Sequence, residues 1–114
     1  MQSEGLEKVL MNLNINQYKL LKLLEKKSNF MLTESISEGS VSYHLSDYNL
    51  EKYTHSIIAE CSVSDIEHLK AKSLLREDKI TSNMNLNLKY YKMVELTATA
   101  YNTFKIVTAG IKLT

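Results

Sequence analysis

Apolar residues along the chain follow two different periods. Near the N-terminus they recur every three or four residues, which predicts successive helices over about 3–13 and 16–27. Between Met84 and Tyr90 apolar and polar residues alternate, which is typical of a half-buried strand, and helical spacing returns over about 98–109. The pattern therefore predicts a chain of helices with a hairpin close to its C-terminus.

The middle of the chain is ambiguous. Residues 28–47 fit either a hairpin or two short helices. Apolar residues over 50–58 fit a helix capped by Asp47 or Asn49, and Ser62 is a suitable cap for another helix that ends near residue 73. We prefer the two helices between 47 and 73, followed directly by the hairpin.

This order of elements, with the residues that follow Ser62, resembles the winged helix-turn-helix family, and the MarR-like branch is nearest. The stretch Leu69 to Leu75 and the later Leu96-Thr97 match short phrases of that family, whereas Ser73 stands where the family has a glycine in the left-handed conformation. The resemblance implies an α+β fold that is mostly helical. It would have a helix-turn-helix at about 47–73, a β-hairpin wing at about 76–97 and a terminal helix, all in a single domain over 1–114.

A second alignment with DNA-binding proteins competes with the first. Residues 30–45 also resemble the helix-turn-helix of ArsR-like repressors, whose recognition helix would then lie at 37–48. We prefer 62–73 as the recognition helix because only this segment is followed directly by the hairpin pattern.

Charge is spread unevenly, although the net charge is only +1. Counting Lys and Arg against Asp and Glu gives +2 for residues 1–27, −6 for residues 28–69 and +5 for residues 70–114. A basic C-terminal block is compatible with a surface that faces phosphates, while an acidic middle on the same face would repel nucleic acid. Charge alone therefore permits DNA binding without requiring it.

The resemblance leads to the hypothesis of a small transcriptional regulator that binds double-stranded DNA as a homodimer. Helices 3–13 and 98–109 would form the dimer and set two recognition helices one DNA turn apart. The expected DNA contacts are Ser62, Ser64, His68, Lys70, Lys72, Arg76, Lys79, Lys89 and Lys92. The alternative is a protein-interaction module of the same fold without nucleic-acid binding, because Asp65 and Glu67 lie in the first turn of the proposed reading helix.

Other classes of function have little support. Cys61 is the only cysteine, and the three histidines lack metal-ligand spacing, so we expect no disulfide, metal or other cofactor. Nucleophile motifs and glycine-rich phosphate loops are absent, so we expect no enzyme. No apolar run approaches the roughly 18–20 residues of a membrane helix, and we expect a cytoplasmic protein. Of Tyr90 and Tyr91, neighbours on a strand, one is expected in the core and the other on the surface.

Overall fold

The computed structural model describes the chain except for residues 1, 50, 53, 79–87 and 114. The described part of the chain forms four helices and five strands. In chain order these are α1 (Gln2–Met11), α2 (Ile15–Lys26), β1 (Phe30–Ser37), β2 (Ser40–Asn49), β3 (Thr54–Cys61), α3 (Val63–Ala71), β4 (Leu75–Asp78), β5 (Leu88–Met93) and α4 (Ala98–Thr108).

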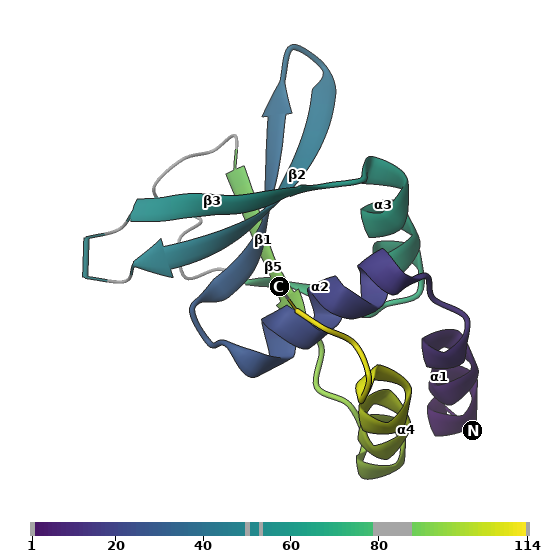
Figure 1. Cartoon of the computed structure of the whole chain (residues 1–114). Helices are drawn as coiled ribbons and strands as arrows, with labels where there is room; N and C mark the ends of the chain where they lie inside the picture. The colour runs from purple at the N-terminus through teal and green to yellow at the C-terminus, as the bar shows by residue number, and fades with distance from the viewer. Residues whose placement is uncertain (1, 50, 53, 79–87, 114) are drawn as a thin grey trace.

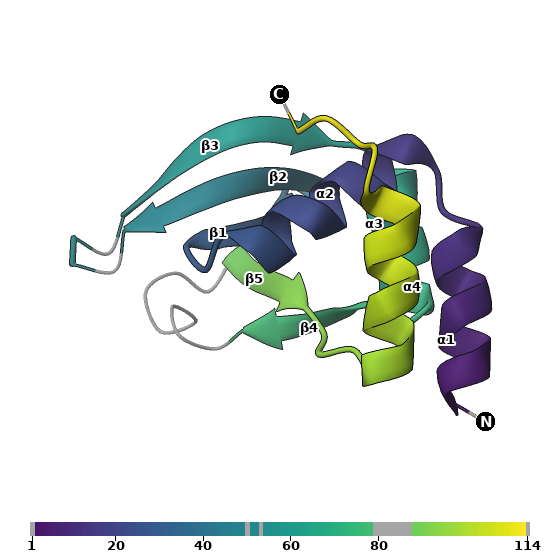
Figure 2. The same ribbon diagram turned by 60° about the horizontal axis from the view of Figure 1, so that its bottom comes forward.

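The strands form one curved antiparallel sheet in the order β3-β2-β1-β5-β4 (Figure 1). β1 lies at its centre, and β3 and β4 lie at its two edges. α2 and α3 pack against one face of the sheet, whereas α1 and α4 pack on each other beyond one end of it (Figure 2). The structure is therefore a strand-rich α+β fold in which the first and last helices are neighbours.

Local sequence explains where several elements begin and end. Glu38 and Gly39 join β1 to β2 with φ angles of 52° and 81°, the arrangement of a tight hairpin turn with two left-handed residues. Asn14 begins α2, because its side chain accepts a hydrogen bond from the backbone N–H of Gln17, whose own side chain accepts one from the Asn14 N–H. Thr97 begins α4 by accepting a hydrogen bond from the Ala100 N–H.

The main core lies between the sheet and the helices. Its fully buried side chains include Leu21 of α2, Leu32 and Tyr43 of the sheet, and Phe104 of α4. A smaller apolar cluster lies on the other face of the sheet and consists of Met31, Tyr48 and Tyr90, with the partly buried Leu88 beside them. Both faces of the central strands are thus buried, although the helices cover only one of them.

The prediction of a mostly helical winged helix-turn-helix is wrong, since the fold is built on a five-stranded sheet. The described residues of the predicted first helix, 47–49 and 54–61, belong to β2 and β3, and the rival recognition helix at 37–48 covers the end of β1, the turn and most of β2. Residues 62–73 do contain a helix, α3, and Ser73 follows it with a φ of 60°. Without a preceding helix, α3 is not part of a helix-turn-helix.

The segment predicted as a separate wing at 76–97 contributes two strands to the main sheet. β4 and β5 do pair with each other, but β5 pairs with β1 as well, so it is a strand of the main sheet. Residues 84–87 of the alternating segment lie outside the described residues. Tyr90 and Tyr91 face opposite sides of the sheet as predicted, yet both are buried, so the expectation of an exposed tyrosine is wrong. The smaller apolar cluster explains the burial of Tyr90.

Candidate protein-interaction surface

β3 is an unusually exposed strand. It pairs with β2 along one side and is the last strand of the described sheet on the other (Figure 1). Six of its eight residues are exposed, and Ile57 and Ile58 at its centre are 60% and 51% exposed. An exposed edge strand presents unpaired N–H and C=O groups to any extended chain that approaches it. β3 thus offers both a backbone template and an apolar centre.

The opposite edge of the sheet is built differently. Arg76, Glu77 and Asp78 supply charge along the described residues of β4. Charged side chains on an edge strand are a usual protection against unwanted strand pairing. β3 has neither proline nor lysine, and its single formal charge at neutral pH is Glu60. Only one of the two edges of the described sheet therefore carries this protection.

A β-bulge lies in the middle of β3. Leu45 pairs with Ala59 and Ser46 with Ile57, so Ile58 is an extra residue that has no partner in β2. Such an insertion bends the strand locally and leaves one residue outside the ladder. Ile58 therefore lies outside the β2–β3 ladder beside Ile57, and both side chains are exposed.

An apolar groove adjoins the C-terminal half of β3. It has a volume of about 310 Å³ and separates β3 from α2 and the start of α3. Leu20 and Leu23 of α2 form one wall, and Ala59 and Cys61 of β3 form the other. Burial raises the pKa of the Cys61 thiol, which makes this cysteine an apolar wall residue more than a nucleophile. The groove therefore lies beside the β3 edge, on the helical face of the sheet.

A buried charge cluster fixes α3 to the sheet behind this surface. The Lys70 Nζ lies 2.9 Å from Oε2 of Glu34, whose residue is only 5% exposed. The Tyr43 hydroxyl lies 2.7 Å from the same Glu34 oxygen and 2.6 Å from Oε2 of Glu67. The Lys70 ammonium also lies over the rings of Tyr43 and Tyr91, at 5.4 and 5.0 Å from their centroids. Each charge in the cluster therefore has a partner from another element.

The protonation states follow from these contacts. Burial would raise the pKa of the Glu34 carboxyl, but hydrogen bonds from Lys70 and Tyr43 outweigh this effect and lower it. Burial likewise opposes the charged form of Lys70, yet its bonds to Glu34 and Tyr43 raise its pKa. Burial and the neighbouring carboxylates raise the pKa of Tyr43. Glu34 is thus ionised, Lys70 charged and Tyr43 neutral at pH 7, which is the state of a structural ion pair.

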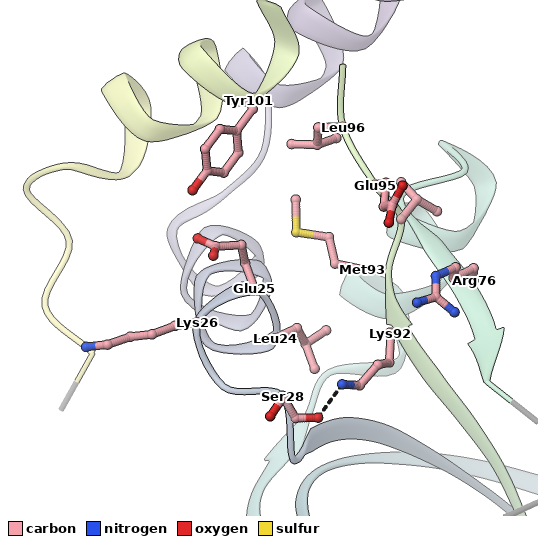
Figure 3. Close-up of a pocket in the computed structure, with 11 residues that line it drawn as sticks. Leu24, Glu25, Lys26, Ser28, Arg76, Lys92, Met93, Glu95, Leu96 and Tyr101 are labelled. Carbon is pink, nitrogen blue, oxygen red and sulfur yellow. Dashed lines mark hydrogen bonds between the residues drawn. The ribbon is translucent and has the colours of Figure 1, made fainter. Parts of the chain in front are cut away.

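A second cavity, of about 530 Å³, lies between α2, β5 and α4 (Figure 3). Leu24, Met93 and Leu96 form its apolar part. Charges of both signs surround this part, namely Glu25, Lys26, Arg76, Lys92 and Glu95. Arg76 and Lys92 of the basic C-terminal block therefore lie among carboxylates.

The described residues among those predicted to contact DNA lie on or beside α3, β4 and β5, and several of them have partners within the molecule. Lys70 is paired inside the molecule with Glu34, and the Lys92 ammonium donates to the backbone carbonyl of Ser28 (Figure 3). Ser62 and Ser64 contact each other at the start of α3, with 3.0 Å between their hydroxyl oxygens. The remaining predicted residues, His68, Lys72, Arg76 and Lys89, are exposed on α3, at its C-terminal end, on β4 and on β5, while Lys79 lies outside the described residues.

Sequence reasoning missed both the edge strand and the buried ion pair. Ile57 and Ile58 were assigned to a helix, so no edge was expected there. Glu34 and Lys70 are 36 positions apart, and only the register that pairs Glu34 with Tyr43 brings them together. The available signal was the β-branched and aromatic content of residues 41–58, which favours strands.

Comparison of the chain with protein-family models, with characterised proteins and with solved structures finds no match. Within the described ranges, no helix has the length and apolar character required to cross a bilayer. The same residues contain no group of three or more His, Cys, Asp and Glu side chains placed to hold a metal ion.

Proposed function

We propose that this protein is a protein-interaction module that binds an extended apolar segment of another protein by strand addition at β3. The observation that carries the proposal is the exposed β3 edge, with Ile57 and Ile58 at its centre and the groove beside it. In strand addition the backbone hydrogen bonds supply affinity, and pockets for alternate side chains supply specificity.

The groove supports this mode of binding. Ala59 and Cys61 of β3 face the helical side of the sheet, since they pair with the core residues Leu45 and Tyr43. Every second side chain of an added strand would face the same side. These side chains would lie next to the groove between β3 and α2, where leucines offer an apolar contact. The partner segment should therefore alternate apolar residues with residues of any type.

The charge distribution favours a protein partner over DNA. A DNA-binding face requires Lys and Arg that converge without intervening carboxylates, because the phosphate contribution dominates affinity. Here Lys70 is neutralised by Glu34, and Glu25 and Glu95 line the same cavity as Arg76 and Lys92. Interleaved acids of this kind are compatible with a protein surface.

Selection of peptides by display on the purified chain tests the proposal. We expect selected peptides to alternate apolar residues and to perturb the amide NMR signals of β3. Binding should be lost in the double variant Ile57→Lys/Ile58→Lys, since lysine on an edge opposes strand pairing. Ile106→Lys is the matched control, because Ile106 is 77% exposed on α4, away from this surface. Failure to select peptides, or equal binding by the double variant, would overturn the proposal.

A gel shift with random duplex DNA at low salt provides the test of the alternative. A salt-dependent shift at micromolar protein that is weakened by Arg76→Ala but unchanged by Ile57→Lys/Ile58→Lys would favour DNA binding instead.

A further inference from the structure

We infer that β3 also pairs with β3 of a second copy of this chain, which joins two sheets across a two-fold axis between Ile57 and Ile58. This inference rests on the proposed function in so far as both use the same edge. A second copy and a partner segment therefore compete for the β3 edge, and a partner segment must displace the second copy before it can bind.

The bulge makes β3 compatible with itself. His55 pairs with Tyr48 and Glu60 with His44, and these two β2 residues are four positions apart and thus on one face. His55 and Glu60 therefore also share a face although they are five positions apart. In an antiparallel pair of identical strands, opposite residues must lie on the same face of the sheet. A regular strand would violate this condition for His55 and Glu60, whereas bulged β3 satisfies it.

The resulting register pairs a hydrogen-bond donor with an acceptor at its ends and apolar residues at its centre. It places His55 opposite Glu60 of the second copy, at both ends of the paired segment. Ile57 then lies opposite Ile58 of the second copy in the centre, where both residues are exposed in the single chain. The Glu60 side chain is 80% exposed, and its Oε2 atom lies 3.8 Å from Nε2 of His44, so it is accessible to a second imidazole. A shift by two residues in either direction would place His55 or Glu60 opposite an isoleucine.

The size of the contact predicts its strength. A single pair of eight-residue strands is smaller than the roughly 800 Å² that each partner buries in a standard interface. We therefore expect a dissociation constant in the micromolar range, so that a partner segment with groove contacts can compete. Each substitution removes two contacts in a two-fold dimer, so loss of the contact between His55 and Glu60 is expected to weaken the dimer roughly tenfold.

Sedimentation velocity over a range of concentrations tests the inference with a charge swap. His55→Glu alone sets carboxylates against each other, and Glu60→Lys alone removes the carboxylate that faces His55, so each variant should dimerise at least tenfold more weakly than the parent chain. Mixed in equal amounts, they should form a heterodimer, because the introduced glutamate then faces the introduced lysine at one end, and His55 still faces Glu60 at the other. His68→Glu is the control, since His68 is exposed on α3, and it should dimerise like the parent chain. Circular dichroism checks that every variant folds.

The outcomes separate this inference from the proposed function. A parent chain that stays monomeric at several hundred micromolar, or variants that do not recover on mixing, would overturn the β3 dimer while peptide binding stands. Dimerisation that follows the charge swap, together with failed peptide selection, would support the dimer and overturn the proposed function. Dissociation of the dimer by a selected peptide would support both.

Discussion

Replacement of Lys70 by Met should reveal how much the buried ion pair contributes to stability. The side chain of Glu34 is only 6% exposed and that of Lys70 is 29% exposed, and 2.9 Å separates their charged atoms. Removal of one member of a buried pair costs about 3–5 kcal/mol, because the other charge loses its partner. The partial exposure of Lys70 places the expected loss near the lower limit, about 3 kcal/mol. Met retains the apolar stem over Tyr43 and Tyr91.

Urea denaturation measures this loss. With an m-value of about 1–3 kcal/mol/M, the midpoint should fall by roughly 1–3 M. Lys72→Met is the control, since Lys72 is exposed at the end of α3 and has no ion pair among the described residues. It should change the free energy of unfolding by less than about 0.5 kcal/mol. The double variant Glu34→Gln/Lys70→Met should lose less than the two single variants together.

The pH dependence distinguishes an ion pair from simple packing. In the parent chain the pKa of Glu34 is lowered, so its contribution is present above the unfolded pKa near 4.3 and is lost as pH falls through the folded value. Without Lys70, burial should raise the pKa of Glu34. At low pH Glu34 is then protonated, and the free-energy cost of an unpaired buried carboxylate disappears. The loss caused by Lys70→Met should therefore be smaller at pH 4 than at pH 7. An equal loss at both values, or a loss below about 1 kcal/mol at pH 7, would refute the reasoning.

Three further changes in stability follow from single contacts, each measurable by denaturation. Ser73→Gly should stabilise the protein by about 0.5–1 kcal/mol, because Ser73 has a φ of 60° and glycine adopts this conformation without a Cβ penalty. Asn14→Ala should cost about 1–2 kcal/mol, because Asn14 caps α2 and also donates to the Asp65 carboxylate at 2.7 Å. The raised pKa of Tyr43 means that the folded state keeps a proton which the unfolded chain loses near pH 10, so stability should fall above that pH. Tyr43→Phe should make this fall shallower between pH 9 and pH 11.

The helices could be predicted from the sequence because their periodicity is local. α1, α2, α3 and α4 all lie where helical spacing or a cap residue indicated a helix. Each has a stripe of apolar residues that packs on one side only, and this is the condition under which a 3.6-residue period is visible. Ser73, the departure from the glycine of the winged-helix phrase, itself has a left-handed φ of 60°.

The first strands could not be recognised with the same rule. Phe30, Met31, Leu32 and Thr33 are all buried because both faces of β1 are covered, so the alternation that marks a half-buried strand is missing. Their neighbours across the sheet are supplied by segments far along the chain, such as Tyr90 and Tyr91. A short apolar run of this kind has the same appearance in a helix and in a central strand.

The bulge in β3 accounts both for the failure of the helical prediction and for the surface proposed here. Ile57 and Ile58 are consecutive and apolar, and with the apolar residues before them they imitate the spacing of one helix face. In the fold, Ile57 pairs with β2 whereas Ile58 is the extra residue of the bulge, and both side chains are exposed. A role for these two isoleucines in the core would require another element to cover them, yet β3 lies at an edge of the described sheet. The two consecutive isoleucines, which made the segment resemble a core helix, are therefore also the residues expected on an edge strand that binds another chain.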